Sequence, residues 1–259
     1  LQRYDNTRKI TVAMHPRGRS LETDSLPAPL VMETDIASYN YRYMYFPGDG
    51  RRFPWMTFYQ SEANTLMMGP NYYEMDLDKV MGLAYWGQID YLGESRGWPA
   101  KGWNDGSFDI SLQPKPIAYL LRTMFKPEEP VVHIDIVDTK ADETEWNGII
   151  FSNDGMSEHW NRTAGKKYNI NVYTNAERID LVVNGKTVAQ QQNTTDPKKR
   201  NKLRFNDIEY QPGYIEAVAY KDGKRVASHR IETTGKATRL KLTADTTTWK
   251  ADGQDLMHV

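Results

Sequence analysis

The hydrophobic pattern of this chain changes at residues 126–130, and this change constrains the fold more than any other feature. Before it, apolar residues run together in short segments, as in strands that are buried on both faces. After it, apolar and polar residues alternate, as in antiparallel strands with one buried face. The sequence therefore predicts an α/β part over residues 1–126 and an all-β part over residues 127–236.

The first part contains four predicted buried strands, at residues 9–15, 35–41, 53–62 and 82–90. Residues 116–125 begin with a proline at the first helical position and place apolar residues at helical spacing, which predicts a helix. Residues 75–81 are predicted to be the end of another helix, and the prolines near residue 28 indicate a loop with at most a short helix. Such alternation indicates an α/β fold with a parallel sheet.

The second part contains alternating segments at residues 131–137, 167–173, 177–183, 213–220 and 225–231. Asn184-Gly185 predicts a hairpin that leads into residues 186–189, and Asp222-Gly223 predicts a second hairpin. Together these segments predict an immunoglobulin-like β-sandwich without a cysteine pair. Residues 239–243 and 256–259 suggest strands, so residues 237–259 are expected to be the start of a further β domain.

Composition narrows the classes of partner. The 33 basic and 34 acidic residues nearly balance, which gives no electrostatic case for nucleic acid or an anionic membrane. No run of about 18 apolar residues predicts a membrane span, and the chain opens without the pattern of a signal peptide. The absence of cysteine excludes disulfides, thiolate metal sites and a cysteine nucleophile.

Glu62 stands where chemistry is expected. It is the one acid in residues 53–64 and lies at the carboxyl end of a predicted buried strand, the edge of a parallel sheet where ligands bind. An ordinary loop or capping acid, paired with a nearby arginine, is the competing interpretation. Aromatic residues make up 12% of the chain, and they suit either sugar binding or an ordinary core.

Several short motifs then occur in a fixed order. They are Asp5-Asn6-Thr7-Arg8-Lys9-Ile10-Thr11, Ser61-Glu62-Ala63-Asn64, Ala84-Tyr85-Trp86-Gly87-Gln88-Ile89-Asp90, Trp103-Asn104-Asp105-Gly106, Lys115-Pro116-Ile117-Ala118-Tyr119, Val172-Tyr173-Thr174-Asn175 and Leu181-Val182-Val183-Asn184-Gly185-Lys186. As an ordered set they resemble glycoside hydrolase family 2, the β-galactosidase and β-glucuronidase family. The resemblance implies the C-terminal part of a TIM barrel, strands five to eight, followed by the immunoglobulin-like domain found in many β-galactosidases of gut bacteria. Lys9 departs from the proline that is usual in the family.

The resemblance implies catalytic roles for two residues. Glu62 matches the family's nucleophile at the end of the seventh strand. Tyr41 matches the sixth-strand tyrosine that hydrogen-bonds the nucleophile, with Tyr43 as a competitor because the spacing varies among members. On sequence alone, a packed sheet aromatic is the favoured interpretation of Tyr41, and the resemblance reverses this.

Four further residues are substrate-binding candidates through the same resemblance. Trp86 matches the aromatic floor of the sugar site, and Asn40 precedes the matched tyrosine. Asn104 or Asp105 falls where the family contacts the substrate or a nearby cation. Asp105, like Asp90, fits equally a turn residue.

A retaining glycosidase needs two carboxyl groups about 5 Å apart. In the family the acid/base comes from an Asn-Glu pair at the end of the fourth strand, and the sequence contains no Asn-Glu dipeptide. Glu22, Glu33, Glu74 and Glu94 are not expected to replace it, because each lies in a predicted loop or connection or beyond the eighth strand. We therefore expect the chain to carry the nucleophile without the acid, and to hydrolyse glycosides at most feebly alone.

The resemblance implies a carbohydrate substrate, no organic cofactor and at most a Mg²⁺ or Na⁺ ion in the whole enzyme. A homo-oligomer of the whole enzyme and a periplasmic or secreted location are further expectations. β-Glucuronidase or β-mannosidase activity and a noncatalytic carbohydrate-binding or structural role are the alternatives to β-galactosidase. The five histidines show no metal-ligand spacing, and surface or core roles are expected for them.

Two features of the second part have competing interpretations. Its aromatics Trp146, Trp160 and Tyr173 either form a carbohydrate-binding platform or, as we expect, serve a structural role. The basic run at residues 197–204 is expected to be a solvated hairpin or loop rather than a nucleic-acid site.

Overall fold

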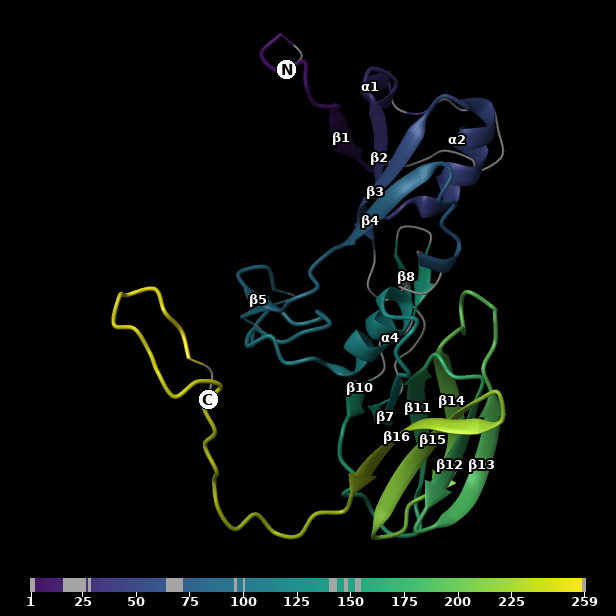
Figure 1. Cartoon of the computed structure of the whole chain (residues 1–259), viewed down its shortest axis with the longest axis vertical. Helices are drawn as coiled ribbons and strands as arrows, with labels where there is room; N and C mark the ends of the chain where they lie inside the picture. Colours follow the sequence, from purple (N-terminus) through teal and green to yellow (C-terminus); the bar gives the residue numbers. More distant parts are fainter. Residues whose placement is uncertain are drawn as a thin grey trace.

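The computed structural model describes residues 3–15, 27, 29–63, 72–95, 97–99, 101–139, 144–146, 149–151 and 155–257. Two bodies of secondary structure follow one another along the chain, a small parallel sheet and a larger antiparallel sandwich, with α4 between them (Figure 1). No helix among these residues is long and apolar enough to cross a bilayer.

The first body is a four-stranded sheet in the order β1-β2-β3-β4, and every neighbouring pair is parallel. Its strands are β1 (Thr11–Met14), β2 (Ile36–Asn40), β3 (Thr57–Ala63) and β4 (Val80–Tyr85). The connections contain α1 (Pro29–Met32), the 3₁₀ turn η1 (Tyr43–Tyr45) and α2 (Phe46–Arg52). Because parallel strands end at the same edge, this order brings the residues after β2, β3 and β4 together.

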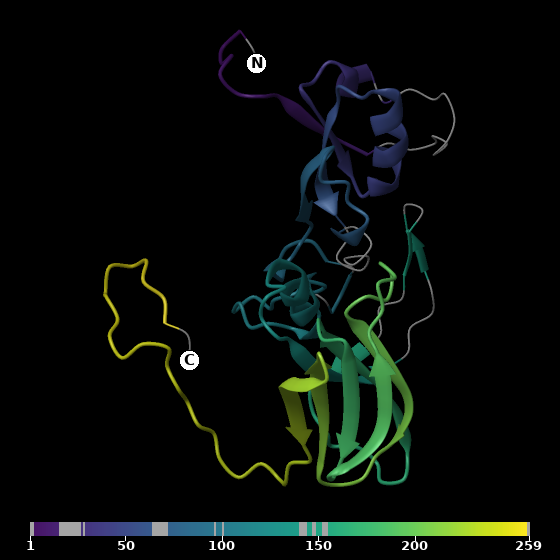
Figure 2. The ribbon, with the colours of Figure 1, turned by 45° about the vertical axis from the view of Figure 1, so that its right-hand side comes forward.

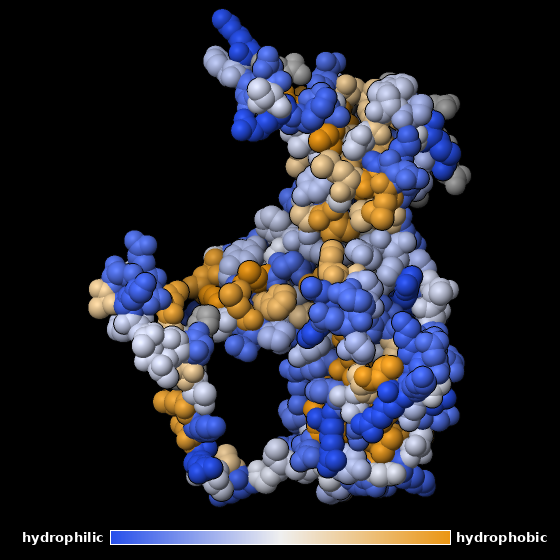
Figure 3. All heavy atoms as spheres, in the orientation of Figure 1, coloured by the Kyte–Doolittle hydropathy of each residue, from blue (hydrophilic) through white to orange (hydrophobic). Residues whose placement is uncertain are grey.

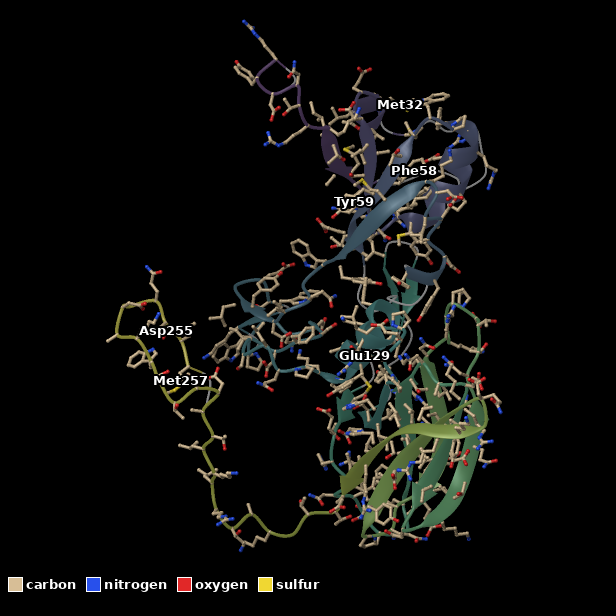
Figure 4. The ribbon with its side chains drawn as sticks, viewed as in Figure 1. Met32, Phe58, Tyr59, Glu129, Asp255 and Met257 are labelled. Atoms are coloured by element: carbon tan, nitrogen blue, oxygen red, sulfur yellow. The ribbon has the colours of Figure 1, made fainter. Side chains whose placement is uncertain are left out.

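Aromatic packing holds the helical connections against the sheet. Phe58, next to Tyr59 on β3 (Figure 4), is fully buried, and Tyr39 of β2 is almost so. The Phe46 ring of α2 lies 5.3 Å from the Tyr39 ring and 5.2 Å from the Phe58 ring, between ring centroids. Burying these three large aromatic side chains contributes substantially to the apolar core of this part.

The structure corrects two predictions in this part, the start of the third strand and the helix end at residues 75–81. The third strand begins at Thr57 rather than at residue 53, because Phe53 caps the C-terminus of α2 and the Trp55 side chain is 72% exposed. Residues 75–81 do not end a helix. Asp76 accepts the backbone N–H groups of Lys79 and Val80, which makes a turn, and β4 begins directly after it.

After β4 the chain forms a small hairpin, β5 (Tyr91–Leu92) paired with β6 (Gly102–Trp103), and then the predicted helix, α4 (Pro116–Phe125). Leu120 and Met124 of α4 are buried in one cluster with Tyr173 of the sandwich. The Asn201 side-chain amide also donates a 2.8 Å hydrogen bond to the Tyr73 hydroxyl. These contacts join the two bodies.

The second body consists of two antiparallel sheets that pack face to face. One has the order β10-β7-β11-β14 and the other β13-β12-β15-β16. The strands of the first sheet are β7 (Val132–Thr139), β10 (Gly155–Ser157), β11 (Lys167–Thr174) and β14 (Lys202–Glu209). The second contains β12 (Arg178–Val183), β13 (Lys186–Gln192), β15 (Tyr214–Lys221) and β16 (Lys224–Glu232), and β8 (Thr144–Trp146) pairs separately with β9 (Ile149–Phe151).

Alternating strand residues fill the space between these two sheets. Ile134, Ile170, Leu181 and Ile215 are fully buried there together with Trp160. Both predicted hairpins are confirmed: Asn184-Gly185 and Asp222-Gly223 turn with positive φ at both residues, as the two-residue turns of hairpins require.

Of three predictions about the second part, two fit the structure and one is wrong. The basic run begins in an exposed turn, as expected for a solvated loop, and its last residues enter strand β14. Trp160 and Tyr173 are 0% exposed, which fits the expected structural role and not a carbohydrate-binding platform, and the side chain of Trp146 lies outside the described residues. Residues 239–243 form no strand, because residues 233–257 run without helix or strand, away from the sandwich, and carry Asp255 and Met257 near their end (Figures 2 and 4).

Candidate active site

The carboxyl edge of the parallel sheet brings together three of the candidate residues. Asn40, the last residue of β2, is in register with Glu62 of β3. The Tyr41 backbone N–H donates a 2.6 Å hydrogen bond to the Glu62 carbonyl oxygen. The Ser61 hydroxyl donates a 2.7 Å hydrogen bond to the Asn40 side-chain oxygen. Backbone pairing therefore fixes Asn40 and Tyr41 beside Glu62.

The side chains of Tyr41 and Glu62 also meet. The Tyr41 hydroxyl hydrogen-bonds the Glu62 carboxylate, and burial, that hydrogen bond and the negative charge of Glu62 raise the pKa of Tyr41. Tyr41 has a φ of 60°, an uncommon backbone conformation for a bulky residue. Strain of this kind is found where the surroundings hold a side chain in a functional position.

Tyr43, the competing candidate, lies elsewhere. Its hydroxyl hydrogen-bonds Glu74, and burial together with the Glu74 charge raises the pKa of Tyr43. Both residues line a small pocket beside α2 with Phe46 and Met75. In this geometry Tyr41, and not Tyr43, contacts Glu62.

Trp86 follows β4 at the same edge. Its backbone N–H donates a 3.0 Å hydrogen bond to the Ala63 carbonyl oxygen, directly after Glu62. The next residue, Gly87, has a φ of 58°, and its carbonyl accepts a 3.0 Å hydrogen bond from the Trp103 indole. A Cβ at Gly87 would lie 2.5 Å from that indole nitrogen, so the turn that positions Trp86 requires glycine.

Two residues that sequence analysis did not select also belong to this edge. The Tyr91 hydroxyl donates a hydrogen bond to the Glu94 carboxylate and forms another hydrogen bond with the Trp86 side chain. The charge of Glu94 contributes to the raised pKa of Tyr41, so this carboxylate lies within electrostatic range of the Tyr41–Glu62 pair. The sequence does not reveal that Glu94 lies near this pair, because Glu94 comes after β4 and approaches the sheet only through the β5–β6 hairpin.

Asn104 and Asp105 follow β6 in the same loop. The Asn104 carbonyl accepts a 2.6 Å hydrogen bond from the Lys115 ammonium, which also pairs with Asp90 at 2.7 Å. Asp90 accepts the Gly106 backbone N–H as well, so it serves as a turn residue. The structure joins Asn104 to this ionic network and shows no contact between it and Glu62.

The segment from residue 86 to residue 112 exposes a group of large apolar side chains, which gather around β5 in Figure 3. Its members are Trp86, Ile89, Leu92, Trp98, Ile110 and Leu112. Trp86 is 39% exposed, and its backbone is hydrogen-bonded to Ala63, the residue after Glu62. An aromatic face next to a carboxylate suits the C–H face of a sugar ring.

The other acidic candidates lie away from this edge or outside the description. Glu74 bonds Tyr43. Glu33 is exposed next to α1, at the other end of the sheet from Glu62. Glu22 and Asn64 are outside the residues that the structure describes.

Comparisons with known proteins show which proteins this chain resembles. Residues 165–227 match a family model described as a domain of unknown function, DUF4982. The chain is 25% identical to the β-galactosidase BoGH2A of Bacteroides ovatus, over 87% of this chain and 29% of the relative. It is 30% identical to a β-glucuronidase of Formosa agariphila, over 58% of this chain and 13% of the relative.

A crystal structure of a glycosyl hydrolase family 2 member from Bacteroides cellulosilyticus superposes with a TM-score of 0.77 and 29% identity. The match covers 88% of this chain and 31% of that protein. The resemblance to glycoside hydrolase family 2 is therefore confirmed over most of the chain. The chain spans less than a third of the length of these relatives.

Proposed function

We propose that this chain is part of a retaining β-glycosidase in which Glu62 is the nucleophile. The observation that carries the proposal is the hydrogen bond from the Tyr41 hydroxyl to the Glu62 carboxylate at the carboxyl edge of a parallel sheet. The consecutive order of β1 to β4 fits strands five to eight of a (β/α)₈ barrel, whose catalytic residues lie at this edge.

The chemistry proceeds in two displacements. The Glu62 carboxylate attacks the anomeric carbon and forms a covalent glycosyl-enzyme, while a second carboxyl group protonates the leaving oxygen. Water then releases the sugar with retention of configuration. Because its pKa is raised, the Tyr41 hydroxyl keeps its proton and serves as a donor that orients Glu62, not as a base.

The remaining residues of the edge bind the sugar in this proposal. Trp86 provides the aromatic floor, and Asn40 and Asn104 or Asp105 provide polar groups near the ring. The sandwich, whose Trp160 and Tyr173 are buried, supports the barrel through α4 and does not bind carbohydrate itself.

The second carboxyl group is proposed to lie in the part of the relatives' length that this chain does not span. Glu94 is the nearest alternative because its charge acts on Tyr41. Glu94 accepts the Tyr91 hydroxyl and is exposed to solvent, which suits a polar contact to the sugar better than a general acid of raised pKa.

β-Galactosides are the proposed substrates, because the match to BoGH2A extends over more of this chain than the match to the Formosa β-glucuronidase. β-Glucuronides are the second candidate, and the name of that second relative supports them. A panel of nitrophenyl β-galactoside, β-glucuronide and β-mannoside separates these possibilities.

The test uses the natural protein that carries this chain. Glu62→Gln is expected to eliminate hydrolysis of the preferred glycoside, whereas the exposed Glu33→Gln serves as the matched control and leaves it unchanged. Full activity of Glu62→Gln would refute the proposed nucleophile. Turnover by the isolated 259-residue chain that Glu94→Gln abolishes would show that the acid is Glu94 and lies within this chain.

A further inference from the structure

A second group of ionisable side chains lies on the sandwich, on the face against which α4 packs. His133 and Asp135 occupy alternate positions of β7 and therefore point to the same side of the sheet. Glu158 directly follows β10, the strand that pairs with β7. The three side chains converge although 23 residues of sequence separate Asp135 from Glu158.

One donor atom from each residue lies within 4.8 Å of the other two. The His133 Nε2 atom is 3.5 Å from the Asp135 Oδ1 atom and 2.7 Å from the Glu158 Oε1 atom. Ligand atoms around a tetrahedral Zn²⁺ with bonds of about 2.0–2.1 Å are roughly 3.3 Å apart. The 3.5 Å between His133 and Asp135 fits this spacing. The 2.7 Å between His133 and Glu158 is shorter, and Glu158 lies at an exposed position where its side chain has room to adjust.

The burial of Asp135 is not explained by a structural role. Its side chain is 0% exposed, and neither carboxylate oxygen has a hydrogen-bond partner among the residues that the structure describes. A buried carboxyl group without hydrogen-bond partners is strongly unfavourable, and an ion is one of the few things that satisfies it.

The surroundings hold the His133 ring in a fixed orientation. Tyr119 of α4 stacks on it with 3.6 Å between ring centroids, and His229 of β16 lies 4.3 Å away, close to parallel. The Nδ1 atom of His229 accepts the Ile134 backbone N–H, so this nitrogen is already used. A clamped imidazole whose Nε2 faces two carboxylates is preorganised as a ligand.

We propose that His133, Asp135 and Glu158 bind a divalent transition-metal ion, with Zn²⁺ preferred. One imidazole nitrogen and two carboxylate oxygens suit Zn²⁺ or Mn²⁺ better than Ca²⁺ or Mg²⁺, which favour sites made of oxygen alone. Three protein ligands leave a coordination position for water. Because Tyr119 packs on the ligand His133, the ion stabilises the attachment of α4 to the sandwich.

The test is a metal titration of the purified protein after treatment with EDTA and removal of the chelator. Isothermal titration with Zn²⁺ is expected to show one equivalent bound, and Co²⁺ is expected to give visible absorption bands of a low-coordinate site. Zn²⁺ is also expected to raise the melting temperature. These readouts do not depend on glycoside hydrolysis, so they stand or fall separately from the proposed function.

Variants identify the ligands. Asp135→Asn keeps the side-chain shape and is expected to weaken Zn²⁺ binding by more than about 100-fold, beyond the usual effect of losing an outer-shell partner. Glu158→Gln, at a partly exposed position that tolerates substitution, is expected to weaken it as well. Glu209→Gln, an exposed change on the same sheet, is the matched control and keeps wild-type affinity.

The proposal is overturned if the wild-type protein binds no stoichiometric Zn²⁺, Mn²⁺ or Co²⁺. It is equally overturned if Asp135→Asn and Glu158→Gln, both folded by circular dichroism, bind the metal as the wild type does. Either result would show that His133 and Glu158 form an ordinary hydrogen bond beside a protonated Asp135.

Discussion

Removing one oxygen atom from Tyr41 tests the arrangement of the proposed site. Tyr41→Phe keeps the ring and deletes only the hydroxyl that donates to Glu62. A hydrogen bond to a charged group is worth about 1.5–3 kcal/mol. Because Tyr41 and Glu62 are only half buried, we expect a loss near the lower figure. That energy corresponds to a decrease of roughly tenfold in kcat/KM, since 1.4 kcal/mol is about a factor of ten in rate.

The assay is steady-state hydrolysis of the preferred nitrophenyl β-glycoside by the natural protein that carries this chain. Tyr43→Phe is the matched control, because it deletes the same atom two residues away, where the hydroxyl bonds Glu74. We expect Tyr43→Phe to retain wild-type kcat/KM. The reasoning would be refuted if the control lost as much activity as Tyr41→Phe, or if Tyr41→Phe lost none.

Three further predictions concern the framework around the sites. Gly102→Ala would place a Cβ on the carbonyl oxygen of strand β5 and 2.8 Å from the next Cα, so we expect it to cost about 1–3 kcal/mol in chemical denaturation. Gly82→Ala, with open space around its Cβ, should cost much less. Trp160→Ala empties the centre of the sandwich, and urea denaturation should show a loss of about 3–5 kcal/mol. Asp90→Ala leaves Lys115 without its 2.7 Å partner, and we expect faster proteolysis of residues 86–115.

Much of the fold is predictable from the sequence because local and tertiary preferences agree. Apolar runs predict the parallel strands, although β1 contains no buried residue and only Val80 of β4 is buried. The Asn184-Gly185 and Asp222-Gly223 turns predict two hairpins. β14 was missed because its alternation is interrupted. Leu203 and Phe205 point inward, but Asp207 adopts a φ of 56° and shifts the next inward residue to Ile208.

The candidate site is partly predictable for the same reason. The position of Glu62 at a strand end left a capping role open, and the family resemblance selected it as the nucleophile. The resemblance favoured Tyr41 but kept Tyr43 as a competitor, because a φ of 60° at Tyr41 breaks the alternation of side chains after β2 and no sequence pattern reveals it. The effect of the Glu94 charge on Tyr41 depends on the β5–β6 hairpin. Its two strands contain only two residues each, so they leave almost no periodic pattern in the sequence.

The cluster on the sandwich shows the limit of spacing rules. His133 and Asp135 are two residues apart on a strand, which is a recognisable pair of ligands. Glu158 joins them only through the pairing of β10 with β7, and the bulge in that pairing hides the register. Sequence analysis therefore assigned His133 a surface or core role.

The most direct test of the central claim is covalent trapping of the nucleophile. A 2-deoxy-2-fluoro β-glycoside with a good leaving group accumulates the glycosyl-enzyme, because fluorine slows its hydrolysis more than its formation. Peptide mass spectrometry of the natural protein is predicted to find the sugar on Glu62, and on no peptide of the Glu62→Gln variant. A label on Glu94 or on any other carboxylate, with Glu62 unmodified, would contradict the account.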